Sequence, residues 1–129
     1  IQFPDSSFDI VILGQTLQAF LNPEKVLNEL LRVGKQAIVT LPNFGHWKVR
    51  LNLLFKGTMP VTKSLPHQWH NTPNLHMCTI KDFSDFCDNK KIKFIKSLAL
   101  DGEKLLNISR TNLGKRNLFS EIGIFLIEK

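Results

Sequence analysis

The chain has 129 residues, of which 43% are hydrophobic and 22% charged, a composition typical of one folded domain and not of a disordered or fibrous protein. No apolar run is long enough to span a bilayer and the first residues do not resemble a signal peptide, so we expect a cytoplasmic protein that binds no membrane. The net charge of +6 does not indicate nucleic-acid binding, because the basic residues are spread along the chain without a nucleic-acid motif.

The first third of the chain predicts a strand, a helix and a second strand. Residues 8–13 form an apolar run that is typical of a buried strand. A helix should then start at Asn22 and Pro23, which suit the N-cap and first helical positions, and end at Gly34. One face of this helix is apolar: Val26, Leu27, Leu30 and Leu31. With a second strand at residues 36–41, this unit requires a parallel strand pair joined by a right-handed crossover.

A turn rich in polar and aromatic groups follows the second strand. In open α/β sheets the ligand crevice lies beyond the carboxyl ends of parallel strands, so this turn is a candidate substrate site. Its candidate residues are Asn43, His46, Trp47 and Arg50. His46 and Arg50 are spaced by one helical turn and could hold an anion such as a carboxylate. The alternative is structural: Trp47 covers the core and Asn43 ties the turn.

The middle of the chain predicts a short helix and then a long loop. The helix spans residues 47–55 and is closed by Gly57. The loop, residues 58–76, is rich in proline and histidine, and a loop of this length is usually functional. We choose His76 as its substrate-binding residue, because it leads directly into the next helix and imidazole titrates near neutrality.

Metal and thiol chemistry are not favoured by this loop. The spacing of the possible ligands fits no standard zinc pattern, so we expect no metal site: His67, His70, His76 and Cys78. Nucleophilic catalysis by either cysteine is not favoured. Cys87 falls on an apolar helix face, and no acid and base pair that would activate Cys78 can be recognised in the sequence. The catalytic residues, if there are any, remain unassigned.

The last part of the chain predicts one more helix and two more strands. Thr79 and Asp82 are spaced as a capping box, and an apolar helix face follows: Ile80, Phe83, Phe86 and Cys87. Residues 92–100 are a strand candidate, and residues 122–127 form the last strand. We expect only a polar connection between these two strands.

Topology predicts that one face of the sheet is bare. If both crossovers are right-handed and step the same way, both helices cover the same face. The strands are nevertheless apolar on both sides, as sheets covered on both faces are. We therefore expect residues 1–129 to form one domain that is the second half of a doubly wound α/β sheet, either a fragment or a chain that self-associates through the uncovered face or edge.

Several motifs resemble a known family. Residues 3–9 look like the entry to the fourth strand of class I S-adenosylmethionine-dependent methyltransferases. Within that superfamily, four motifs resemble the MetW family of methionine-biosynthesis proteins: Ile12-Leu13-Gly14-Gln15-Thr16-Leu17-Gln18, Leu41-Pro42-Asn43-Phe44-Gly45-His46-Trp47, Met59-Pro60-Val61-Thr62-Lys63, and Asn71-Thr72-Pro73-Asn74-Leu75-His76-Met77-Cys78-Thr79-Ile80. The resemblance implies strands four to seven of a Rossmann-like methyltransferase sheet, with the last strand antiparallel and inserted between the second and third strands of this chain.

The resemblance also implies a cofactor and a partner. The family's glycine-rich turn and acidic residue, which hold S-adenosylmethionine, have no counterpart here, and only Gly14, Gln15 and Thr16 match positions that line its methionine end. We therefore expect the complete protein, and not this chain alone, to bind S-adenosylmethionine tightly. The implied function is an accessory role beside homoserine O-acyltransferase in methionine biosynthesis. The alternative is a methyltransferase that acts on a small cytosolic substrate.

Overall fold

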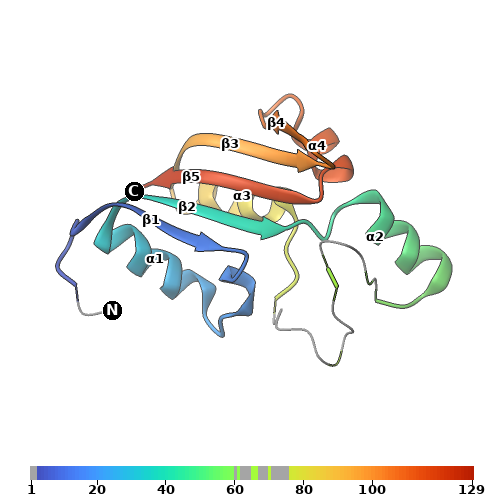
Figure 1. The fold of residues 1–129 in the computed structure, drawn as a ribbon, viewed down its shortest axis with the longest axis horizontal. Helices are drawn as coiled ribbons and strands as arrows, with labels where there is room; N and C mark the ends of the chain where they lie inside the picture. The colour runs from blue at the N-terminus through green and yellow to red at the C-terminus, as the bar shows by residue number, and fades with distance from the viewer. Residues whose placement is uncertain (1–2, 60, 62–64, 67–69, 71–75) are drawn as a thin grey trace.

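A five-stranded mixed sheet forms the centre of the computed structural model, which describes residues 3–59, 61, 65–66, 70 and 76–129 (Figure 1). Its strands, in the spatial order β1-β2-β5-β3-β4, are β1 (Phe8–Gly14), β2 (Gly34–Pro42), β3 (Lys93–Asp101), β4 (Lys104–Asn107) and β5 (Ile122–Glu128). β1 and β2 are parallel, and β5 runs antiparallel to both β2 and β3. The expected α/β class and the antiparallel last strand between the second and third predicted strands are confirmed.

The helices of the described residues are η1 (Leu17–Ala19), α1 (Pro23–Val33), α2 (Trp47–Leu51), η2 (Asn52–Lys56), α3 (Ile80–Asn89) and α4 (Leu113–Phe119). The two longest, α1 and α3, begin where the local sequence signals place them. Asn22 caps α1 by accepting the Lys25 N–H at 3.1 Å. At α3 the predicted capping box is complete, since Thr79 Oγ1 accepts the Asp82 N–H at 3.0 Å and Asp82 Oδ2 accepts the Thr79 N–H at 3.1 Å.

Gly34 ends α1, as predicted, but for a different reason. Its backbone is extended (φ −109°) and not left-handed, because the chain passes from α1 into β2 without a connecting loop. A Cβ atom here would lie 2.6 Å from Val11 Cγ2 and 3.2 Å from the Leu30 carbonyl oxygen. The absence of a side chain therefore lets α1 approach β1 closely.

Both long helices cover the same face of the sheet. Val39 and Phe125 point to this face from β2 and β5, and they share one buried cluster with Leu27 of α1 and Phe83 of α3. The cluster comprises Leu17, Leu27, Leu31, Ala37, Val39, Leu41, Ile80, Phe83, Cys87, Ile92, Ala99, Phe125 and Ile127. Burial of this apolar surface is the main favourable term in folding.

The opposite face of the sheet is apolar and open. Ile10 and Ile12 alternate with the inward-facing residues of β1, and Ile12 is 69% exposed. Ile38 beside Ile12, and Leu126 on β5, are only partly buried. None of the helices in the described part of the chain packs on this face. This agrees with the expected one-sided sheet.

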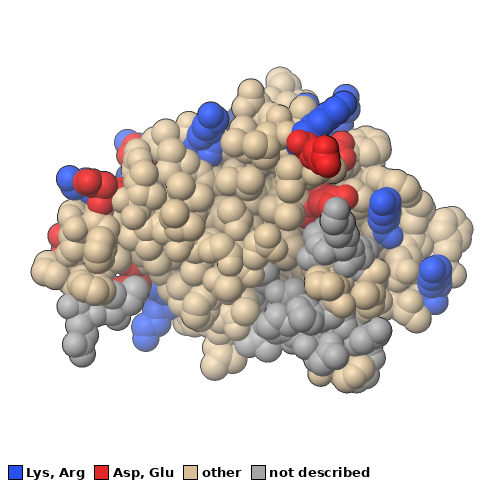
Figure 2. All heavy atoms as spheres, in the orientation of Figure 1, with Lys and Arg blue, Asp and Glu red and all other residues tan. Residues whose placement is uncertain are grey.

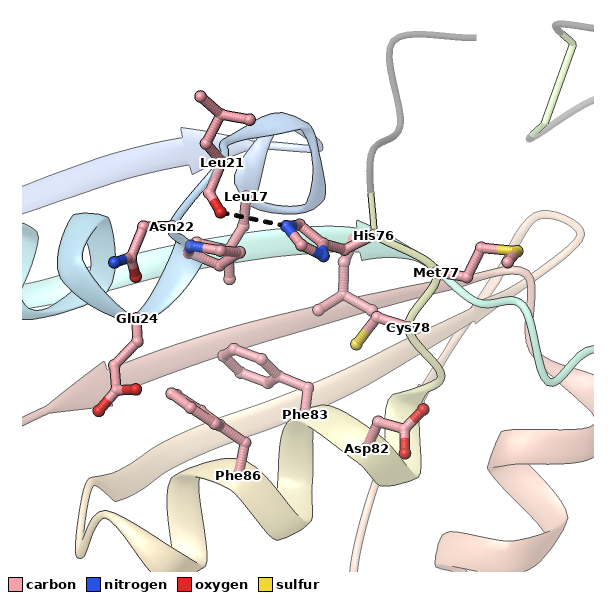
Figure 3. Close-up of a pocket in the computed structure, with 12 residues that line it drawn as sticks. Leu17, Leu21, Asn22, Glu24, His76, Met77, Cys78, Asp82, Phe83 and Phe86 are labelled. Carbon is pink, nitrogen blue, oxygen red and sulfur yellow. Dashed lines mark hydrogen bonds between the residues drawn. The ribbon is translucent and has the colours of Figure 1, made fainter. Parts of the chain in front are cut away.

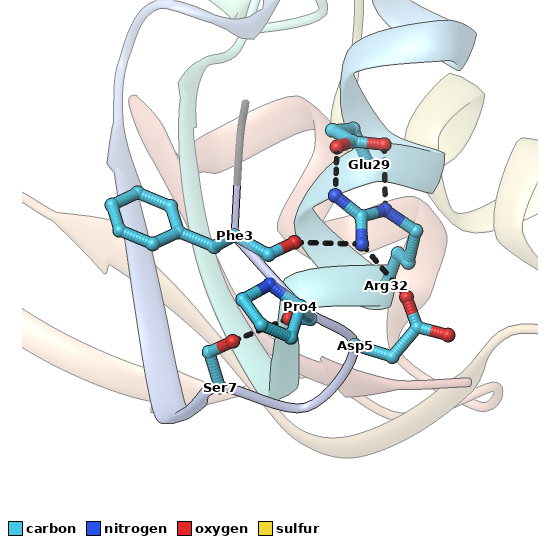
Figure 4. Close-up of polar contacts among 6 residues, drawn as sticks. All are labelled: Phe3, Pro4, Asp5, Ser7, Glu29 and Arg32. Atoms are coloured by element: carbon cyan, nitrogen blue, oxygen red, sulfur yellow. Dashed lines mark hydrogen bonds and ion pairs between the residues drawn. The ribbon is translucent and has the colours of Figure 1, made fainter.

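An arginine of α1 fixes the turn that precedes β1 (Figure 4). Arg32 Nη1 donates to the Phe3 carbonyl oxygen at 2.9 Å and to Asp5 Oδ1 at 2.7 Å, while Nε donates to Glu29 Oε2 at 3.0 Å. The Arg32 carbonyl oxygen accepts the Ser6 N–H at 2.8 Å. The hydrogen bond from Arg32 lowers the pKa of the Glu29 carboxyl group. The start of β1 is thereby joined to the end of α1.

Two parts of the chain differ from the sequence prediction. The helix expected at residues 47–55 is α2 followed by a π-helical turn, η2, which ends at Gly57 in the left-handed region (φ +66°). The expected polar connection before the last strand contains β4 and α4. The apolar residues of β4 and α4 do not recur at the spacing of a strand or a helix, so these elements depend on tertiary contacts. Ile108 and Leu113 provide such contacts by packing against the core.

Candidate functional site

A cleft of about 570 Å³ opens between the start of α1, the end of β2 and the start of α3 (Figure 3). Phe83 and Phe86 point into it from α3, and Cys78 faces them from the segment before this helix. Its lining residues are Leu17, Leu21, Asn22, Pro23, Glu24, Leu41, His76, Met77, Cys78, Asp82, Phe83 and Phe86. The cleft lies at the carboxyl end of a parallel strand, where α/β folds hold their ligands.

His76, the residue chosen from the long loop, is part of this cleft. Its Nε2 atom lies 3.4 Å from the carbonyl oxygen of Leu21, just before α1, so the imidazole links the two walls of the cleft. His70 is described but does not line this cleft. His67, another histidine of the loop, lies outside the described residues.

Most polar groups around the cleft already have partners. Asn22 Oδ1 caps α1, and one oxygen of Asp82 caps α3. Glu24 Oε1 lies 2.6 Å from Lys90 Nζ. The remaining surface is mainly hydrocarbon, aromatic rings and sulfur, so the cleft suits an apolar or partly apolar ligand.

The Cys78 thiol is held in its protonated form. Burial, together with the nearby charge of Asp82, raises the pKa of its thiol to about 12. The Sγ atom also donates to the Thr79 carbonyl oxygen at 3.3 Å. Because the thiolate is the reactive form, the protonated side chain serves as part of the apolar wall.

The residues matched to the cofactor's methionine end lie beside the cleft. Gly14 and Thr16 are exposed at the end of β1, and Thr16 precedes Leu17, which lines the cleft. The Gln15 N–H donates to the carbonyl oxygen and Oγ1 of Thr40, each at 2.9 Å. Gln15 has a φ of +50°, an uncommon conformation for a residue with a side chain and one that occurs at ligand sites.

Asn43 is a buried structural joint. It is 2% exposed, and its Nδ2 donates to the carbonyl oxygens of Asn117 at 2.7 Å and Ser120 at 2.8 Å. Its Oδ1 accepts the N–H groups of Gly45 and Ile80, each at 3.0 Å. These four bonds use the full capacity of the amide and join the end of β2 to α3 and α4. The geometry favours the structural interpretation, in which Asn43 ties the turn.

The other three residues of this turn lie at the start of α2. His46 is buried and caps the helix, with Nδ1 accepting the Lys48 N–H at 3.3 Å. Burial lowers the pKa of His46, which favours the neutral imidazole. Arg50 Nε donates to the Gly45 carbonyl oxygen at 2.7 Å, and the Trp47 ring is partly exposed. None of them lines the cleft beside His76, so the predicted substrate residues lie in two places. Their role in substrate binding stays a prediction.

Sequence reasoning missed the aromatic wall of the cleft. Phe83 and Phe86 were interpreted only as a helix face that packs on the core. A usable signal was the pair of strong helix starts at Asn22 and Thr79, because both helices begin near the carboxyl end of the sheet. Residues 3–59, 61, 65–66, 70 and 76–129 hold no cluster of three or more His, Cys, Asp or Glu side chains that could bind a metal. They also hold no helix long and apolar enough to cross a membrane.

The fold is similar to part of a solved methyltransferase structure. A solved structure from Thermotoga maritima, described as a S-adenosylmethionine-dependent methyltransferase and possible histamine N-methyltransferase, superposes with a TM-score of 0.67. The match covers 100% of this chain and 59% of that one, at 15% identity. Identity this low shows a shared fold and nothing about the reaction.

The sequence comparisons identify the family. The family model described as methionine biosynthesis protein MetW matches residues 1–127, and the chain belongs to this family. The bifunctional methionine biosynthesis protein MetXA/MetW of Rhodopirellula baltica is 44% identical over 84 residues. That match covers 64% of this chain and spans only 14% of the length of the curated relative.

Proposed function

We propose that this chain is part of an accessory protein that works beside homoserine O-acyltransferase in methionine biosynthesis, in the cytoplasm. The single observation that carries the proposal is the name of the Rhodopirellula baltica relative, which combines MetXA and MetW in one bifunctional protein. We take MetXA as the acyltransferase that the family resemblance implies. Two units that are joined in one chain in one organism are candidates for a complex in another.

The chemistry of the cleft supports an accessory role. The carboxylates of Glu24 and Asp82 are engaged in an ion pair and a helix cap, and the Cys78 thiol is protonated. A group that is already held in this way is a poor general base or nucleophile. Apart from the imidazole of His76, the described residues of the cleft therefore offer a binding surface more readily than a catalytic group.

The test uses the full-length protein and the acyltransferase of the same organism. We expect acyl transfer from the acyl donor to homoserine to be faster when both proteins are present, and the two to elute together in gel filtration. An unchanged rate with separate elution would contradict the accessory role. Bovine serum albumin at the same concentration controls for nonspecific protection of the enzyme.

The second candidate is a methyltransferase that acts on a small substrate. The position of the cleft favours it, because it lies at the carboxyl end of a parallel strand and beside Gly14, Gln15 and Thr16. Incubation of the full-length protein with S-adenosylmethionine labelled in its methyl group tests this candidate. Label transferred to a small molecule without the acyltransferase would favour it over the accessory role.

S-adenosylmethionine binding is proposed for the complete protein only. The exposed end of β1 fits one wall of a cofactor site: Gly14 leaves the approach open and Gln15 turns the backbone away from the sheet. When bound, S-adenosylmethionine supplies an activated methyl group. Because the end of β1 forms only one wall of the cofactor site, residues 1–129 should bind S-adenosylmethionine weakly. We therefore expect an excess of S-adenosylmethionine to leave their melting midpoint unchanged. A concentration-dependent rise in the midpoint would contradict this expectation.

We infer that the open face of the sheet is covered by a further part of a doubly wound fold or by a second copy of the chain. Two observations support this: Ile10 and Ile12 are exposed, and the chain matches only 59% of the solved methyltransferase. For residues 1–129 alone, we expect light scattering to detect association at high concentration. The double variant Ile10→Lys/Ile12→Lys should remove it, whereas Leu21→Lys, at a residue 88% exposed and away from the sheet, should not.

A further inference from the structure

A helical projection at one end of the molecule exposes a group of apolar side chains. The projection comprises α2 and η2, and Figure 1 shows it extending beyond the end of the sheet. Val49 is the only buried residue among these ten. Leu54 is 73% exposed and Phe55 78% exposed. The other exposed apolar residues of the projection are Trp47, Leu51 and Leu53. Exposed apolar side chains gathered on one short element favour an interaction site.

The projection is a built element and not a frayed helix end. Arg50 holds its base through the bond from Nε to the Gly45 carbonyl oxygen. Asn52 Nδ2 donates to the Thr58 carbonyl oxygen, and the Gly57 N–H donates to the Asn52 carbonyl oxygen at 3.1 Å. These bonds close the π-helical turn. Since π-helical turns are rare and are frequently found at functional sites, its presence here supports a binding role.

The net positive charge of the sequence comes from the stretch that contains this projection. Of the 17 Lys and Arg residues, six lie in residues 35–81, a stretch without a single Asp or Glu. The other eleven balance the eleven Asp and Glu residues of the rest of the chain. Three of the six, Lys48, Arg50 and Lys56, belong to the projection. Figure 2 shows basic side chains and no acidic ones at the tip of this end of the molecule.

We propose that the projection is the element that docks on the acyltransferase, where its apolar side chains enter a groove bordered by Asp and Glu residues. This inference rests on the proposed accessory function. The charged side chains of the projection, Lys48, Arg50 and Lys56, are all basic, and positive charge of this kind attracts carboxylates and repels basic proteins. The relative that unites MetXA and MetW in one chain favours a protein over a lipid or a nucleic acid as the partner.

The proposal is tested by measuring the dissociation constant of the full-length protein and the acyltransferase. One variant, Leu54→Ser/Phe55→Ser, removes apolar surface, and another, Lys48→Glu/Lys56→Glu, reverses charge. We expect each to raise the dissociation constant at least tenfold. All four side chains are exposed, so circular dichroism and the melting midpoint should be unchanged. Added salt should weaken the native complex more than the charge-reversed one.

Matched controls lie on exposed surfaces away from the projection. Leu105→Ser/Phe119→Ser controls for loss of apolar surface, and Lys104→Glu/Lys115→Glu for charge reversal, and both should bind the acyltransferase as the native protein does.

Three outcomes would overturn the inference. If the native protein does not bind the acyltransferase, the accessory function fails first and the inference with it. If the native protein binds but the projection variants bind equally well, only the inference is wrong. If the projection is required only for binding to phosphatidylserine vesicles, its partner is a membrane surface and not the acyltransferase.

Discussion

The joint at Asn43 offers the sharpest test of how this fold is held together. Its side chain makes four hydrogen bonds to backbone groups of Asn117, Ser120, Gly45 and Ile80, all inside the protein. The substitution Asn43→Ala removes all four and leaves two buried carbonyl oxygens and two buried N–H groups without their partner. Water cannot readily replace these bonds, because the residue is 2% exposed.

The expected loss follows from the number of bonds. At about 1 kcal/mol for each, the free energy of unfolding should fall by about 4 kcal/mol, a large part of the stability of a domain of this size. This corresponds to a fall in the melting midpoint of about 12 °C or more. Asn43→Asp should also be destabilising: its carboxylate can still accept from Gly45 and Ile80, but it places a second, charged oxygen against the two carbonyl oxygens.

The assay is thermal and urea denaturation followed by circular dichroism. Asn89→Ala, at the exposed end of α3, is the matched control and should shift stability by less than about 0.5 kcal/mol. The reasoning is refuted if Asn43→Ala melts within a few degrees of this control. Crystallography of the variant would show whether α4 has moved away from the end of β2.

Three further predictions concern local features. Gly34→Ala should destabilise the chain by more than about 1 kcal/mol in urea, because its Cβ would meet Val11 at 2.6 Å, whereas Gly114→Ala, in α4 with open space, should be neutral or stabilising. Burial lowers the pKa of His46 below 6.5, so stability should fall as pH drops below about 6.5, and His46→Asn should reduce this dependence in denaturation curves at several pH values. With a pKa of about 12, Cys78 should react with iodoacetamide far more slowly at pH 8 in the folded protein than in urea, as mass spectrometry can measure.

The sequence predicted the elements whose signals are local. The side chains of Asn22 and Thr79 cap their helices by accepting the N–H of the residue three positions later. Because these contacts are local, both helix starts can be recognised from the sequence alone. The strands followed from short apolar runs, and the bare face followed from the handedness of the crossovers. The position of the last strand came from the family resemblance.

The rest depended on contacts between residues far apart in the chain. The four-bond role of Asn43 includes partners 74 and 77 positions away, which no local pattern reveals. The cleft arises where α1, β2 and α3 converge, and its aromatic residues had been assigned to the core. β4 and α4 are short, and they form because Ile108 and Leu113 pack on the core. Propensity alone is too weak to predict elements of this kind.

The central position of β5 determines when the sheet can form during synthesis. The seven residues Ile122–Glu128 follow every other element in sequence, yet they join β2 on one side to β3 on the other. Until the ribosome has released them, β1 with β2 and β3 with β4 are two separate pairs, each marginal alone and each with an inner edge that can pair with another chain. A premature stop codon just before Ile122 would therefore divide the sheet in two, so nascent chains need protection from aggregation until translation has passed this strand.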